Sequence, residues 1–83
     1  MTDGQIDSVM KSLFEFYMAE TPPPTNVMVY KDSIAKLEED EGYYKATVKI
    51  VTNFGCTKAH RLHLKFKINK RGKVYTETVE PEY

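Results

Sequence analysis

The sequence predicts an α+β domain in which one N-terminal amphipathic helix packs on a curved, four-stranded antiparallel meander. Two observations lead to this fold class. Apolar residues recur at helical spacing over the first twenty residues, and they alternate at strand spacing over much of the remaining chain. With 83 residues, the chain is expected to form a single domain, 1–83, because so short a chain buries too little surface to divide between two cores.

The helix is expected over about residues 2–20. Its apolar face follows the spacing i, i+3, i+4 and i+7 and is formed by Ile6, Val9, Met10, Leu13, Phe14 and Tyr17. Thr2 and Gln5 have the spacing of a capping box, which places the helix start near Thr2. Thr21 precedes a proline, and such residues avoid the helical conformation. The helix is therefore expected to end near Glu20, and residues 21–26 to form a stiff proline corner.

Four strands are expected at about 27–38, 43–52, 58–68 and 73–79. The first has four successive apolar residues and is expected to bend near Asp32 or Ser33. The second and third alternate between apolar and polar residues, the pattern of half-buried strands. Turn-forming sequences separate the strands: EDEG, ending at Gly42, then NFGCT and NKRG. The apolar pattern of the fourth strand is weaker, as in many edge strands.

The resulting order is one helix followed by four strands. This order is similar to that of the cystatin-like and nuclear-transport-factor-like folds, in which a curved sheet wraps a helix. The resemblance covers the order of elements over most of the chain and no sequence motif. It implies a fold and no activity.

Composition and charge narrow the class of protein. The chain is 41% hydrophobic and 29% charged, as in globular domains, and it has neither a signal peptide nor an apolar run of ~20 residues that would cross a membrane. The single cysteine, Cys56, cannot form an intrachain disulfide, so a cytoplasmic protein without membrane contact is expected. Residues 1–41 carry a net charge of −6 and residues 42–83 carry +6. Such asymmetry hints at a charged partner or at pairing between subunits.

The motifs of common enzymes are missing, and we expect neither catalysis nor a metal or cofactor. Cys56, His60 and His63 are the one cluster with suitable chemistry. On a continuous strand the two histidines point to opposite faces, because their numbers differ by three. No glycine-rich phosphate loop or nucleophile elbow occurs in the sequence.

A basic face is expected on the side of the sheet opposite the helix. Its basic residues come from the second and third strands: Lys45, Lys49, Arg61, His63, Lys65 and Lys67. Tyr43 and Tyr75 are expected at its aromatic edge. Glu77 is expected to pair across strands with Lys65 or Arg61, which would cancel part of the field. Such a face could bind the phosphate groups of a nucleic acid and stack its bases. The same residues are equally expected on the solvent-exposed side of any sheet.

A second candidate surface lies in the first strand. Both of its faces are apolar at Val27, Met28, Val29 and Tyr30, so one helix is expected to leave part of it uncovered for a partner or a second copy. The function predicted from the sequence is therefore that of a non-enzymatic protein-binding domain, of adaptor or inhibitor type, with a protein partner or homodimer. The alternative is a nucleic-acid-binding module using the basic face. A weaker alternative is a small-ligand pocket between helix and sheet, where His60 is the only inward polar group.

Overall fold

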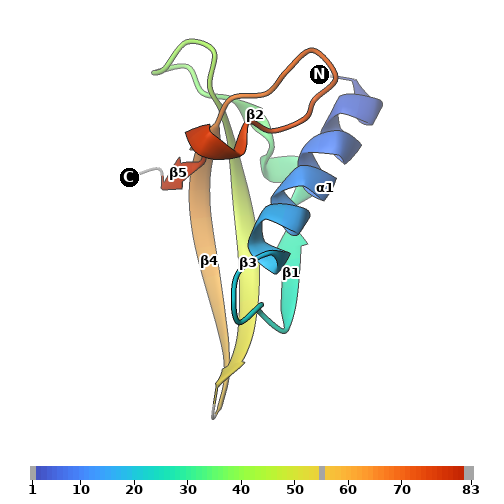
Figure 1. Ribbon diagram of the computed structural model, residues 1–83. Coiled ribbons are helices and arrows are strands. Elements are labelled where there is room, and N and C mark those ends of the chain that lie inside the picture. The colour runs from blue at the N-terminus through green and yellow to red at the C-terminus, as the bar shows by residue number, and fades with distance from the viewer. Residues whose placement is uncertain (1, 55, 82–83) are drawn as a thin grey trace.

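A long hairpin of strands β3 and β4 forms the centre of the sheet. The computed structural model describes residues 2–54 and 56–81. Helix α1 (Asp3–Met18) precedes the strands β1 (Asn26–Val29), β2 (Ala35–Lys36), β3 (Tyr44–Phe54), β4 (Cys56–Phe66) and β5 (Glu80–Pro81). The pairs are antiparallel in the order β1-β3-β4-β5, and β2 also pairs with β3. One helix lies across one face of this sheet, which confirms the predicted α+β class (Figure 1).

Helix α1 begins with the predicted capping box. The Gln5 N–H donates to Thr2 Oγ1 at 3.2 Å, and the Thr2 N–H donates to Gln5 Oε1 at 2.8 Å. The helix buries Val9, Leu13 and Tyr17 against the sheet. Burial, with a smaller effect of the charge on Glu20, raises the pKa of Tyr17 to about 12, so its phenol stays neutral in the core.

The loop after β4 supports the start of the helix. Gln5 Nε2 donates to the carbonyl oxygen of Lys70 at 3.0 Å. Gly72, in the predicted NKRG turn of the same loop, has a φ of +87°, and a Cβ atom there would lie 2.6 Å from the Gln5 carbonyl oxygen. Only glycine therefore suits both the backbone conformation and the space at this position.

We expect Gly72→Ala to destabilise the fold more than Gly42→Ala. Gly42 also has a positive φ, of +86°, but a Cβ atom there would meet nothing within 4 Å. The strain at position 42 is worth about 1–2 kcal/mol. The clash at position 72 is expected to add about 1–3 kcal/mol. Urea unfolding measures the free energy of unfolding of both variants. Equal losses of stability would show that the close contact between α1 and Gly72 adds no cost.

The predicted first strand, 27–38, is divided by a 3₁₀ turn at Lys31–Ser33, which confirms the bend expected near Asp32 or Ser33. Ser33 Oγ donates to the carbonyl oxygen of Tyr30 and accepts the N–H of Thr47 at 2.8 Å. A side chain thus replaces the backbone partner that a continuous strand would have supplied.

The prediction of a strand over 73–79 is wrong. Val74 forms an isolated bridge with Ile68, Thr76–Thr78 form a second 3₁₀ turn, and β5 begins only at Glu80. The cause is the same arrangement as at Ser33: Thr78 Oγ1 donates to the carbonyl oxygen of Tyr75 and accepts the N–H of Lys67 at 2.9 Å. The segments YKDSI and YTETV are thus two copies of one local structure, one on each side of the hairpin.

Ser33→Ala is expected to cost more stability than Thr78→Ala. The hydrogen bonds of Ser33 are partly buried, so the Thr47 N–H would lose its acceptor at a cost of about 1–3 kcal/mol. The bonds of Thr78 are exposed, and water can replace the hydroxyl at a cost below about 1 kcal/mol. Thermal and urea unfolding of the two variants compare the two costs. A larger loss for Thr78→Ala would contradict this order.

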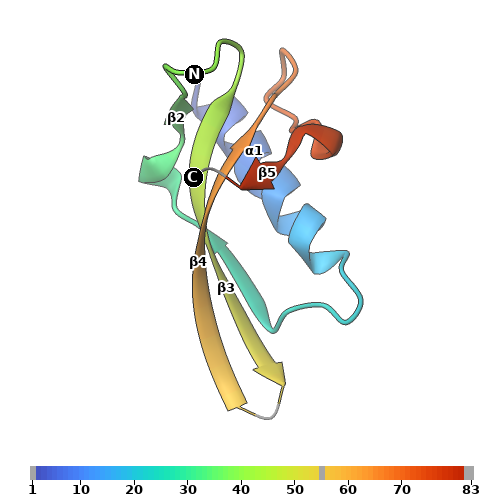
Figure 2. The ribbon, with the colours of Figure 1, turned by 90° about the vertical axis from the view of Figure 1, so that its left-hand side faces the viewer.

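The hairpin is longer than the helix that covers it. Sixteen residues of α1 span about 24 Å, whereas eleven residues in each of β3 and β4 span about 37 Å. The tip of the hairpin therefore extends beyond α1 and β1 (Figures 1 and 2). Burial along the inward row of β4 is therefore confined to its second half. Leu64 and Phe66 are in the core, but Leu62 is 36% exposed and His60 is exposed.

Candidate functional site

The outer face of the sheet, opposite α1, brings most of the predicted basic residues together. Antiparallel partners point to the same face, so the register places these side chains in cross-strand rows. Lys45 lies opposite Lys65, and Lys49 lies opposite Arg61. These four residues belong to the set for which the sequence predicted a basic face, which also includes His63 and Lys67 and is called the basic face below.

Acidic residues enter the basic face at Lys65. Its Nζ lies 2.9 Å from Asp40 Oδ2 and 3.1 Å from Glu80 Oε1. The hydrogen bond to Asp40, followed by that to Glu80, raises the pKa of Lys65, which stays charged. The predicted pairing of Lys65 or Arg61 with Glu77 is not among the ion pairs of the described residues. Glu77 lies in the 3₁₀ turn, and Glu80 instead stands opposite Lys65 in β5.

Aromatic rings on this face are covered by cations. The Arg61 guanidinium lies 5.5 Å from the centroid of the Tyr30 ring. The Nζ atoms of Lys65 and Lys67 lie 5.2 and 5.1 Å from the centroid of the Tyr43 ring. Such cation–π contacts order both partners. The Tyr43 ring is therefore already covered by two lysines and is not free to stack on a base. Tyr75, the other tyrosine predicted at the edge of this face, is 44% exposed.

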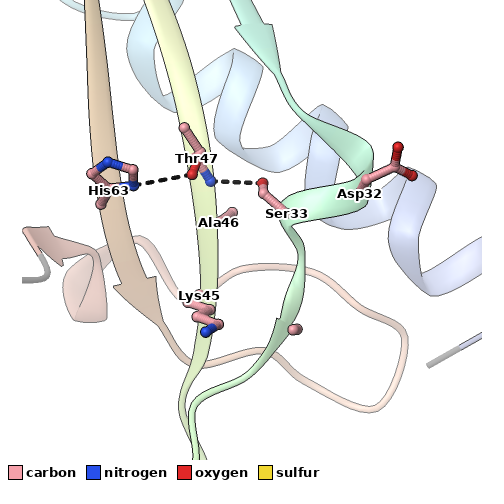
Figure 3. Close-up of a pocket in the computed structure, with 7 residues that line it drawn as sticks. Asp32, Ser33, Lys45, Ala46, Thr47 and His63 are labelled. Atoms are coloured by element: carbon pink, nitrogen blue, oxygen red, sulfur yellow. Dashed lines mark hydrogen bonds between the residues drawn. The ribbon is translucent and has the colours of Figure 1, made fainter.

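An open hollow lies on the same face beside β2 (Figure 3). Thr47 Oγ1 is 3.1 Å from His63 Nδ1, and the Thr47 N–H donates to Ser33 Oγ. Asp32 and Lys45 complete the polar lining. The sequence predicted that His60 and His63 point to opposite faces of the strand, and the register agrees, because His60 lies opposite Ile50 and His63 lies opposite Thr47.

The apolar residues of the first strand divide between the two faces. Val27 and Val29 are buried against α1, so they are removed from the predicted contact surface. Met28 points to the outer face, lies opposite Lys49 and is 49% exposed. Tyr30 is half-buried beneath Arg61. The predicted contact segment therefore narrows to Met28 and Tyr30, directly beside the basic face.

The outer edge of β4 is a feature that sequence reasoning missed. Within residues 2–54 and 56–81, β5 pairs with β4 only at Leu64 and Lys65. The segment Cys56–His63 is exposed along its length and pairs only with β3 in this part of the chain. Comparing the length of the predicted helix with that of the predicted hairpin would have indicated this projecting tip.

Comparison with protein-family models, curated proteins and solved structures finds no match for this chain. The similarity to cystatin-like and nuclear-transport-factor-like folds thus remains one of element order. Among the described residues, no helix is long and apolar enough to cross a membrane.

We expect Asp40→Asn combined with Glu80→Gln to increase the affinity of the domain for heparin. The double change leaves Lys65 without its two counter-charges, so the basic face gains two net positive charges. Elution from a heparin column should shift to higher salt. The matched control is Asp7→Asn with Glu15→Gln, which changes the net charge equally on exposed positions of α1. An equal shift in both variants would show that only total charge matters.

Proposed function

We propose that this chain is a non-enzymatic protein-binding domain whose contact surface is the outer face of the sheet around Met28. The observation that carries the proposal is the half-exposed Met28 in register with Lys49 and Arg61. Met, Tyr and Arg are enriched at protein interfaces, and buried anchors among them supply much of the binding energy. A partner that covers Met28 would also contact Arg61, which already lies over Tyr30.

The charge pattern favours a protein partner over nucleic acid. A phosphate track needs a continuous positive surface. Here Asp40 and Glu80 interrupt the surface at Lys65, and Asp32 lies in the hollow beside Lys45. A mixture of charges with an apolar centre instead matches the ordinary make-up of a protein interface.

Site-directed crosslinking tests the proposal. A photo-reactive benzoylphenylalanine placed at position 28 should capture a defined protein from cells that carry the gene. The same group placed at position 15, on exposed helix α1, is the matched control. Excess unlabelled wild-type domain should prevent the capture, and Met28→Asp should compete at least tenfold more weakly because it places a charge in the apolar centre. Circular dichroism checks that this variant keeps its fold.

The same proteins captured from positions 28 and 15, or equal competition by Met28→Asp, would contradict the proposal. Sedimentation of the purified domain tests whether the partner is a second copy. A dimer that Met28→Asp separates would identify one.

The nucleic-acid alternative has its own measurement. Fluorescent single- and double-stranded oligonucleotides are titrated at about 50 and 200 mM salt, a range over which several phosphate contacts change affinity by orders of magnitude. We expect no binding at the lower salt. Tight binding that falls steeply with salt, and that is lost in the double variant Lys45→Glu with Lys65→Glu, would favour nucleic-acid binding over protein binding as the function.

A further inference from the structure

We propose that an acidic, extended segment of a partner protein adds as a strand to the outer edge of β4 between Thr57 and Arg61. This inference rests on the protein-binding function proposed above and names the chemistry of the partner. It concerns the tip of the hairpin, which projects beyond α1 and β1 (Figures 1 and 2). Residues 57–61 are exposed and pair with residues 49–53 of β3 on one side.

The register determines which backbone groups face the open edge. The Tyr30 N–H donates to the Thr47 carbonyl oxygen, so the odd-numbered residues of β3 bond toward β1 and the even-numbered ones toward β4. The odd-numbered residues of β4 consequently point their backbone groups away from β3. Lys67, which directly follows β4, continues this alternation, because its carbonyl oxygen accepts the Tyr75 N–H. The same alternation turns the N–H and C=O groups of Thr57, Ala59 and Arg61 outward.

An edge with alternating donors and acceptors matches another peptide backbone. Phosphate oxygens would satisfy the N–H groups of this edge but would leave its carbonyl groups without donors. An added strand satisfies both, and this is the known mode of strand addition to an exposed sheet edge. The chemistry of the edge thus favours an extended peptide over a nucleic acid.

Side-chain charge specifies an acidic partner. Residues 56–63 contain Lys58, His60, Arg61 and His63 and no acidic residue. Among the described residues, the ion pairs of the domain are those of Lys65 and do not involve this segment. Arg61 points to the outer face and Lys58 to the helix side, because their numbers differ in parity. Carboxylates opposite these two residues would be three positions apart in the partner strand.

An apolar hollow beside the edge offers a place for an anchoring side chain. It lies between the end of α1 and β5 and is lined by Phe16, Leu62, Val79 and Pro81 among others. A partner residue opposite Leu62 would point into this hollow, on the helix side of the sheet. An antiparallel partner is therefore expected to read apolar, acidic, any, any, acidic from its N-terminal end.

A second copy of the chain fits this edge less well. Pairing two β4 edges across a two-fold axis would bring together two copies of a segment that contains Lys58 and Arg61 and no acidic residue, and like charges on neighbouring strands are destabilising. The opposite edge of the sheet is less open, because the Val27 N–H is taken by Asn26 Oδ1 at 2.9 Å. The edge of β4 is therefore the better site for strand addition.

The test is a selection of displayed random twelve-residue peptides on the purified domain at about 50 mM salt. We expect the enriched peptides to be acidic and to carry the pattern given above. The best of them is then synthesised with a fluorophore, and its Kd is measured by anisotropy. Failure to enrich any peptide, or enrichment of peptides without acidic residues, would overturn the proposal.

Two variants separate the backbone contribution from the side chain. Ala59→Pro removes an outward N–H and leaves the pairing with β3 intact, whereas Ala59→Ser keeps the N–H. We expect Ala59→Pro to bind the peptide at least tenfold more weakly than Ala59→Ser. Equal affinities would overturn the strand model. N-methylation of single backbone amides of the peptide tests the same point without changing the domain. Methylation should abolish binding only at alternate residues, whose N–H groups face β4.

Charge reversal tests the specificity of the edge. Lys58→Glu with Arg61→Glu should weaken binding at least tenfold, and a peptide whose two acidic residues are replaced by lysine should recover the affinity. No recovery would show that the acids do not face this edge.

The outcomes also separate this inference from the function proposed above. One outcome is a peptide that binds the Ala59→Pro and Ala59→Ser variants with equal affinity and fails to bind the Met28→Asp variant. That result would place the peptide on the outer face of the sheet. In that case the protein-binding function survives and the edge site is overturned. A dimer in sedimentation that Ala59→Pro separates would make the occupant a second copy, which overturns the acidic partner.

Discussion

The register of the β3–β4 hairpin is the constraint on which the rest of the structure depends. It directs Ala46, Val48 and Leu64 toward the helix and Lys45, Lys49 and Arg61 toward the outer face. A slip by one residue would exchange the two sets and place charges against α1. Core and candidate surface are thus two results of the same pairing, and neither can change its register independently of the other.

The two hydroxyl-bonded turns limit how far the sheet grows around this hairpin. At Ser33 and at Thr78 a side chain accepts the backbone N–H that a flanking strand would otherwise have bonded. Each turn also carries one apolar residue to the core, Ile34 on one side and Val79 on the other. The half of the hairpin near residues 44 and 66 is framed on both sides, and the tip keeps an open edge on β4.

Periodicity in the sequence predicted the helix, its cap, the central hairpin and the two faces of the sheet. These elements depend on local contacts and on the spacing of apolar residues, both of which are visible in the chain. The prediction of the fourth strand was wrong because the hydrogen bonds of the Thr78 hydroxyl stabilise a 3₁₀ turn and outweigh a weak alternating pattern. The exposure of Leu62 could not be predicted from its own strand pattern, because it depends on the length of a helix elsewhere in the chain. The predicted pairing of Lys65 with Glu77 was wrong for the same reason. A continuous fourth strand would have placed Glu77 near Lys65, whereas Glu80 lies opposite it in β5.

The support of α1 by the loop at Gly72 joins segments made at different times on the ribosome. Gln5 and Lys70, which are hydrogen-bonded, are separated by 65 positions. At about 5–20 residues per second, the helix is synthesised several seconds before its support exists. During that interval its apolar face has no complete sheet to pack against. The apolar residues of α1 therefore lack their complete set of partners until the loop at Gly72 has been synthesised.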